Sequence, residues 1–290
     1  MKRILILTIL LFLIINISYC QNSYPLNNRV NHNRVNTRKN LLQKYTLDQL
    51  SVMISSGNFD DIYVGDYIEM EMTTEISSGN NVTEKVRWLV ADIDYFYNKT
   101  DSPITAHHIV LLAEDCFTTL HRMNSSNTTA NGFAGCEMFT TTLPLYNTAI
   151  INAFGNSHIL SYHQLLTNSM ESSIPSMSGD NYTGASNGWA WTSTTLCLMS
   201  EPHVYGTKIL SSNYYDVGIN NSQFSLFREL PEKICCGQGF NKNIATNKSY
   251  WLLSVVNSSR FGRVFNSGHS SLSPSSYANA NGLRPYFLFK

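Results

Sequence analysis

The first half of the chain holds histidines and aspartates whose spacing could support metal binding or acid–base chemistry. His107 and His108 are adjacent in a run of strand-forming residues. Because neighbouring strand residues point to opposite faces of a sheet, the two imidazoles are not expected to share a metal ion. Asp92 and Asp94 should lie on one face, where paired carboxylates could bind calcium or transfer protons. The alternative is a polar outer face near the end of a strand.

The sequence does not set a motif for covalent catalysis or phosphate binding in the context that such a motif needs. The Gly-x-Ser-x-Gly pattern of residues 184–188 lies in a predicted surface loop and not between a strand and a helix, and the glycine-rich stretches lack the lysine of a phosphate-binding loop. The adjacent Cys235 and Cys236 do not provide the two spaced pairs of a zinc site. We therefore expect no catalytic residue, no metal and no cofactor, and a protein that is not an enzyme.

The stretch from Asn266 to Phe287 has the composition of a recognition surface. It consists mainly of Ser, Asn, Gly, Tyr and His and then turns into an aromatic strand, which a slack linker would not do. Small polar residues around a rigid tyrosine are typical of loops that make adaptable contacts. We expect Arg284 to be a buried or half-buried clamp. The predicted ligand contacts, with Tyr277 as the anchor, are Asn257, Arg260, His269, Ser270, Tyr277, Asn279 and Asn281.

A second aromatic feature is the pair Trp189 and Trp191. The two residues share a face at strand spacing. They are either anchors of the core, which we favour, or an aromatic platform of the kind that stacks on sugars.

The N-terminal residues predict the compartment of the protein. Residues 1–20 have the order of a secretory signal peptide, with a short basic segment, an apolar run and small residues before Gln21. A membrane anchor is the alternative, but the run is shorter than the roughly 20 residues of a bilayer span. Residues 21–44 are basic and rich in Asn and should form a disordered tail. We expect residues 45–290 to form one domain that is secreted or held at the cell surface, without a membrane span after signal removal.

The composition of the chain indicates which class of binding partner to expect. The formal net charge is zero and only 14% of residues are charged, so electrostatics does not favour nucleic acid as a partner. We expect a glycan or a cell-surface protein instead. Cys116 and Cys136 are the first candidates for a disulfide. Asn-x-Ser/Thr sequons, which this composition also produces by chance, make glycosylation candidates of Asn81, Asn98, Asn124, Asn127, Asn181, Asn220, Asn247 and Asn257.

Periodicity predicts two early helices and many short strands. Thr46 and Gln49 are spaced as a capping box before a helix over residues 47–56, and a second helix over 144–154 is closed by Gly155. The composition of residues 172–188 predicts a surface loop. Without regular strand–helix alternation, we expect an α+β fold with a loop-rich, mainly antiparallel sheet. Strands are predicted on both sides of Gly65 and over 84–97, 106–117, 158–166, 189–199, 250–256, 261–265 and 284–290.

Two short motifs follow one another near the C-terminus. Trp251, Leu252 and Ser254 form the first, and residues 282–285, Gly-Leu-Arg-Pro, form the second. This ordered set resembles a DUF-type domain of unassigned function found in phage tail-associated and gut-bacterial surface proteins, whose members close with Trp-Leu-Arg-Ser and Gly-Val-Arg-Pro strands. Here Leu253 replaces the first Arg, and Leu replaces Val. The resemblance covers residues 65–290, implies a C-type-lectin-like or formylglycine-generating-enzyme-like fold, and carries over no catalytic residue.

The expected function is therefore recognition. The chain should be a secreted, non-catalytic module that binds a glycan or cell-surface ligand through loops near its C-terminus. One alternative is an exported structural or coat subunit that cross-links chains through a free cysteine. Another is a Cys-dependent enzyme of the formylglycine-generating type, which would need an accessible, reactive thiol such as that of Cys235 or Cys236.

Overall fold

The computed structural model describes residues 38–175, 183–212, 222–228, 243–272, 277 and 281–290. The predicted signal peptide and the predicted tail up to residue 37 lie outside these residues. The end of the predicted tail is already part of the fold. Leu41 is buried in the 3-10 helix η3 (Leu41–Gln43), and the Lys39 N–H donates to the Asp66 carboxylate at 3.2 Å.

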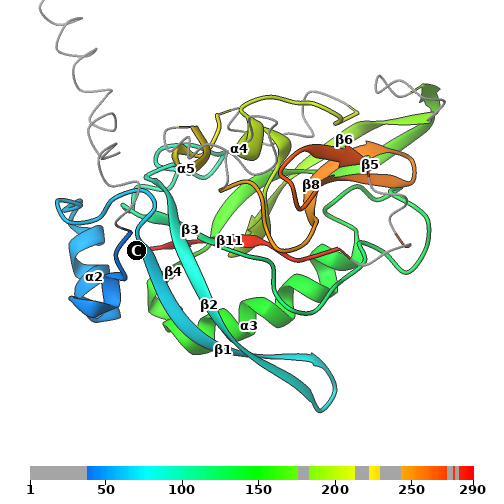
Figure 1. The fold of residues 1–290 in the computed structure, drawn as a ribbon. Helices are drawn as coiled ribbons and strands as arrows, with labels where there is room; N and C mark the ends of the chain where they lie inside the picture. The colour runs from blue at the N-terminus through cyan, green and yellow to red at the C-terminus, as the bar shows by residue number, and fades with distance from the viewer. Residues whose placement is uncertain (1–37, 176–182, 213–221, 229–242, 273–276, 278–280) are drawn as a thin grey trace, which may run out of the picture.

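The last strand of the chain lies inside the main sheet (Figure 1). Every residue of β11 (Pro285–Phe289) is buried, because the strand has antiparallel neighbours on both sides. Phe287 and Phe289 are thus interior, as the pattern predicts. The sheet order is β1 (Tyr67–Ser77), β2 (Asn80–Ile93), β3 (Ile109–Ala113), β11 and β4 (Ile159–Leu160), with β7 (Leu196–Leu198) also paired to β11.

The strands predicted over residues 84–97 and 106–117 are present as β2 and β3, whose bounds differ from those predicted. β2 and β3 pair antiparallel, with Leu89 opposite Leu112, and all of β3 is buried as its continuous apolar run predicts. The strand predicted before Gly65 is wrong. Gly65 has a φ of 93°, and the Asp66 carboxylate accepts the Tyr63 N–H at 3.1 Å, so these residues form a turn.

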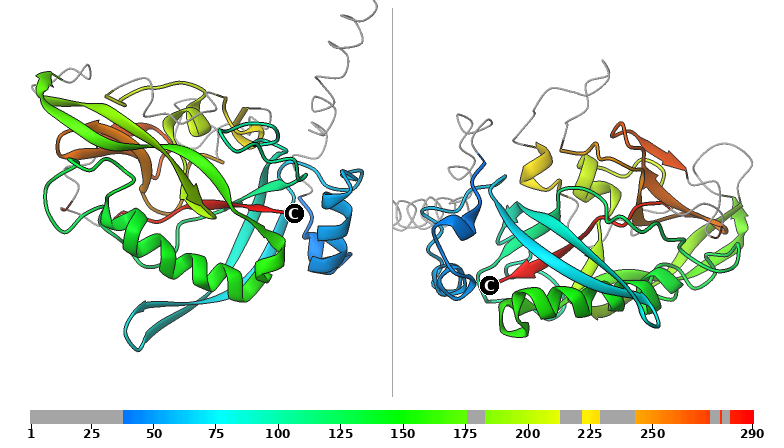
Figure 2. Two further views of the ribbon diagram at one scale, coloured as in Figure 1. Left: turned by 180° about the vertical axis from the view of Figure 1, so that it is seen from behind. Right: turned by 60° about the horizontal axis from the view of Figure 1, so that its bottom comes forward.

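Two helices flank the sheet, as predicted. α2 (Leu47–Ser55) begins at the expected capping box, in which Thr46 and Gln49 bond each other reciprocally. α3 (Leu143–Phe154) follows the π-helix η4 (Met138–Thr142) and lies across one face of the sheet (Figure 2). Its Phe154 ring packs 5.0 Å from that of Phe287. The short helices are η5 (Asn156–His158), α4 (Glu201–Tyr205) and α5 (Ser225–Arg228).

Two smaller sheets complete the described structure. β8 (Tyr250–Asn257), β9 (Arg260–Val264) and β10 (Ser270–Leu272) form an antiparallel meander, and β5 (Tyr162–Pro175) pairs with β6 (Thr183–Thr194) in a long hairpin. The surface loop predicted over 172–188 is therefore wrong for its two ends, which continue the strands of this hairpin. Residues 176–182 lie outside the described residues.

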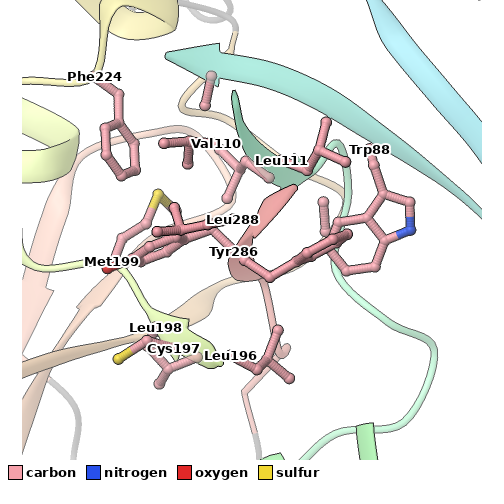
Figure 3. Close-up of a cluster of buried hydrophobic side chains, with 14 of the residues drawn as sticks. Trp88, Val110, Leu111, Leu196, Cys197, Leu198, Met199, Phe224, Tyr286 and Leu288 are labelled. Carbon is pink, nitrogen blue, oxygen red and sulfur yellow. The ribbon is translucent and has the colours of Figure 1, made fainter. Parts of the chain in front are cut away.

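The core lies between α3, the main sheet and the segments that cover its other face. Tyr286 and Leu288 of β11 lie among Val110, Met199 and Phe224 (Figure 3). The Trp88 ring of β2 packs edge-on against Phe287 at 5.0 Å. Few helices and mostly antiparallel sheets make the fold α+β, as expected.

Candidate recognition surface

The turn between β9 and β10 carries a stack of three side chains. The Arg263 guanidinium lies 4.6 Å from the centre of the Phe265 ring, and the Phe265 and His269 rings are 4.7 Å apart with an interplanar angle of 15°. We call Arg263, Phe265 and His269 the hairpin stack. All three are partly exposed, so a ligand can reach a planar, partly cationic surface.

Turn geometry explains why the two rings meet. The Phe265 N–H donates to the His269 carbonyl at 2.9 Å, and the Gly268 N–H donates to the Phe265 carbonyl at 2.8 Å. Gly268 takes a φ of 95°, which favours glycine. The closed turn sets Phe265 and His269 side by side. A bond of 2.8 Å between Ser267 Oγ and His269 Nδ1 fixes the imidazole.

Arg263 is held in the stack without an ion pair among the described residues. Its Nη1 donates to Asn281 Oδ1 at 3.3 Å, and its buried Nε finds no acceptor in the described part of the chain. Burial lowers the pKa of Arg263, but a guanidinium remains protonated at physiological pH. The hairpin stack therefore keeps a positive charge that no carboxylate within the described ranges neutralises directly.

A buried carboxylate supports the hairpin from its inner side. Glu201 begins α4 and is fully buried. It accepts the N–H groups of Ile209 at 2.8 Å and Ser211 at 3.0 Å, and the Ser270 hydroxyl at 3.4 Å. These bonds connect β10 to α4 and to the segment that follows α4. They therefore hold the strand next to the hairpin stack in place.

The residues predicted to contact a ligand differ in how deeply they are buried. Asn257 is 1% exposed and its Oδ1 accepts the Ser259 N–H at 3.0 Å, so it holds a turn. Asn281 is also buried, and Ser270 bonds Glu201. Asn257 and Asn281 are therefore held in the interior, whereas Ser270 is partly exposed. Arg260, His269 and Tyr277 are at least partly exposed, and Asn279 lies outside the described residues.

Sequence reasoning missed Arg263 and Phe265. The signal was present, because the two residues are spaced i and i+2 in the strand-like run from Phe261 to Phe265 and therefore point to one face. The predicted Arg284 clamp is present. Arg284 is 1% exposed, and its Nε donates to the Ala113 carbonyl at 2.9 Å.

The two tryptophans of the long hairpin lie outside the core. Trp191 is 37% exposed and Trp189 is half-buried, whereas Trp88 and Trp251 are fully buried. The favoured interpretation as core anchors is therefore wrong for Trp191. Leu165 lies opposite Trp191 in the register and is half-buried as well. We call Leu165, Trp189 and Trp191 the tryptophan strip.

The aspartates and histidines do not form a joint site. Asp92 is buried and accepts the Ser225 N–H at 2.9 Å, and burial raises its pKa to about 6. Asp94 accepts the His108 N–H and bonds His107 Nδ1 at 2.7 Å. In the described part of the chain, no three His, Cys, Asp or Glu side chains are grouped to hold a metal ion.

The described cysteines are buried free thiols. Cys116, Cys136 and Cys197 are unbridged, so the predicted pair of Cys116 and Cys136 is not joined. The two lie in different surroundings: Cys116 Sγ is 3.5 Å from the Thr246 hydroxyl, whereas Cys136 lies in the turn before η4. Burial raises the pKa of Cys136 to about 12 and also raises that of Cys116. Cys235 and Cys236 lie outside the described residues.

The asparagines of the sequons also differ in burial. Asn124 and Asn257 are buried, and both amide atoms of Asn124 are hydrogen-bonded, to the Thr128 carbonyl at 2.7 Å and the Glu137 N–H at 2.9 Å. A glycan on either would require the side chain to leave the interior. Asn81, Asn98, Asn127 and Asn247 are exposed, and Asn181 and Asn220 lie outside the described residues.

Comparisons with protein-family models, curated proteins and solved structures found no match to this chain. Within the described residues, no helix has both the length and the apolar character needed to cross a membrane.

Proposed function

We propose that the protein is a secreted or cell-surface recognition module, non-catalytic and lectin-like, that binds a glycan through the outer face of the β9–β10 hairpin. The observation that carries this proposal is the hairpin stack. It presents a guanidinium and two rings on a closed turn, with Arg260 on the same hairpin. Tyr277, which is 47% exposed, is a further aromatic side chain that a ligand can reach.

The chemistry of the stack suits a sugar. Aromatic side chains combine an apolar face with a polar tip, so they pack on the C–H face of a sugar while hydroxyls find hydrogen-bond partners. A guanidinium and an imidazole supply such partners. Because Arg263 has no carboxylate partner among the described residues, a sugar that carries an acidic group gains an additional attraction.

The burial of Cys116, Cys136 and Cys197 argues against any of them as the nucleophile of a Cys-dependent enzyme. A catalytic cysteine needs an accessible thiol with a lowered pKa. Cys116, Cys136 and Cys197 are buried, and burial raises their pKa values. Recognition by a preformed surface requires no such group.

A glycan array probed with the full chain tests the proposal. We expect selective binding that is lost in Phe265→Ala and in His269→Ala, because each variant removes one ring of the stack. Trp191→Ala is the matched control, since it removes a partly exposed aromatic side chain from the other hairpin. Binding that survives both hairpin variants, or that is lost only in Trp191→Ala, would overturn the assignment of the surface.

A further inference from the structure

A small cavity lies where β2, the end of β3 and the residue before β11 meet, and none of its lining residues belongs to the hairpin stack. Its volume is about 230 Å³, and its lining includes Arg38, Glu114, Asp115, Asn243 and Arg284. A second cavity of about 260 Å³ shares Glu114 and Asp115 and adds Glu69, Glu84, Lys85 and Arg87. The two cavities therefore adjoin along the wall formed by Glu114 and Asp115.

The buried guanidinium of Arg284 lines the first of these cavities. The Arg284 guanidinium donates to the carbonyls of Ala113 at 2.9 Å, Asn243 at 2.8 Å and Ile244 at 3.3 Å, and to the Tyr250 hydroxyl at 3.3 Å. All four acceptors are neutral. No carboxylate of the described residues forms an ion pair with it, and one of its five N–H donors is left over. Burying an unpaired charge is costly, so an anion in the cavity would be favourable.

The carboxylates of the shared wall and the second cavity divide into paired and unpaired ones. Glu69 forms ion pairs with Lys85 and Arg87, and Glu114 forms them with Arg38 and Arg87. Asp115 accepts only the Asn247 N–H, at 3.0 Å, and Glu84 accepts only from Thr118. Among the described residues, neither Asp115 nor Glu84 has a cationic partner. The lining thus offers one unmatched positive charge and two unmatched negative charges.

We propose that the adjoining cavities bind a small aminocarboxylic zwitterion, whose carboxylate pairs with Arg284 and whose ammonium group pairs with Asp115. A simple anion would neutralise only Arg284, and a simple cation only the carboxylates. Arg284 and Asp115 both line the first cavity, whose volume of about 230 Å³ is below the roughly 300–1,000 Å³ of pockets for drug-sized molecules. The ligand is therefore of the size of a single free amino acid. This site is separate from the hairpin stack and does not depend on the function proposed above.

Titrations of the full chain followed by NMR or calorimetry test the site. The probes are glycine, β-alanine and 4-aminobutyrate, which space the two charges differently, with acetate and methylammonium as half-ligands. We expect at least one zwitterion to bind about ten-fold more tightly than either half-ligand, because a charge-assisted hydrogen bond is added at each end. If no zwitterion binds, or if acetate binds as tightly as all of them, the proposal fails.

Variants locate the binding. Asp115 is exposed, and Asp115→Asn keeps an oxygen for the Asn247 N–H, so this variant should fold. It should weaken zwitterion binding about ten-fold and leave acetate binding unchanged. Asp48→Asn, at an exposed carboxylate of α2, is the matched control and should change neither. Zwitterion binding that is the same in Asp115→Asn as in the wild type would overturn the site.

Discussion

The C-terminal strand and the hairpin that precedes it are both rich in aromatic residues, yet they serve opposite purposes. Phe287 of β11 is fully buried, with the rings of Trp88 and Phe154 each 5.0 Å away. Phe265, at the end of β9, is half-exposed and stacks on Arg263 and His269. Aromatic content alone does not separate core from surface.

The two regions differ in how they are paired with neighbouring strands and covered by other segments. β11 is paired on both sides and covered by α3 and by the segments around Met199 and Phe224. The β9–β10 turn is held by the Tyr205 hydroxyl, which donates to the Gly268 carbonyl at 3.0 Å, and by the Thr246 N–H, which donates to the Asn266 carbonyl at 3.2 Å, whereas the side chains of the hairpin stack stay partly exposed. The comparison predicts that changes in β11 alter stability, whereas changes in the hairpin stack alter binding.

The largest effect on stability is expected from Phe287→Ala. Removing a fully buried ring leaves a cavity between Trp88 and Phe154, so the free energy of unfolding should fall by about 3–5 kcal/mol. Urea denaturation followed by tryptophan fluorescence measures this change. Near-wild-type stability would show that β11 is not the centre of the core.

A second test concerns the acid stability of the core behind β11. His203 is buried, with its ring 5.6 Å from that of Tyr286, and burial lowers its pKa to about 3. The unfolded chain binds a proton near pH 6.5, so the stability conferred by the neutral imidazole is present above that pH and lost as the pH falls toward 3. We expect a loss of about 3 kcal/mol between pH 7 and pH 4 that is absent in His203→Gln. Equal pH profiles for the two proteins would contradict the burial of His203.

Asp92 should show the opposite pH dependence. Its pKa is raised by burial to about 6, so its contribution to stability is greatest below pH 3.8 and is lost as the pH rises through 6. Denaturation of the wild type and Asp92→Asn should differ by a pH-dependent amount on the order of 2 kcal/mol between pH 4 and pH 7. A constant difference across this range would mean that Asp92 is solvated.

The smallest effects on stability are expected at the recognition surface. His269→Ala and Tyr277→Ala remove side chains that are at least partly exposed, so each should change the free energy of unfolding by about 0.5 kcal/mol or less. Thermal unfolding monitored by circular dichroism checks this. A loss comparable to that of Phe287→Ala would remove the distinction between the two regions.

Local signals in the sequence predicted local structure well. The Thr46 and Gln49 capping box, the buried run of β3 and the terminal strand are all where the patterns place them, because each depends on a few neighbouring residues. The polar ends of β5 and β6 were mistaken for a loop. These ends pair with each other across the hairpin, with Glu171 opposite Ala185 and Pro175 opposite Thr183, so backbone pairing makes strands of residues whose composition is typical of a loop.

The sequence predicts only part of the candidate site, because the rest depends on contacts that form only in the folded chain. His269 and Tyr277 were identified from the composition of the C-terminal stretch. The burial of Asn257 and Asn281 depends on contacts with distant residues, and the bridge expected between Cys116 and Cys136 depends on a proximity that sequence spacing does not reveal. Arg263 was missed because its stack forms only when the turn closes.

The most direct test of the account is the binding of Phe265→Ala and Trp191→Ala to the glycan that the wild-type chain selects from an array. Both variants remove a partly exposed aromatic side chain, and only the first belongs to the hairpin stack. We predict that Phe265→Ala lowers affinity at least about ten-fold, as expected for the loss of a stacking contact of about 1.4 kcal/mol, while Trp191→Ala leaves it unchanged. The reverse pattern would place recognition on the tryptophan strip and contradict the proposed site.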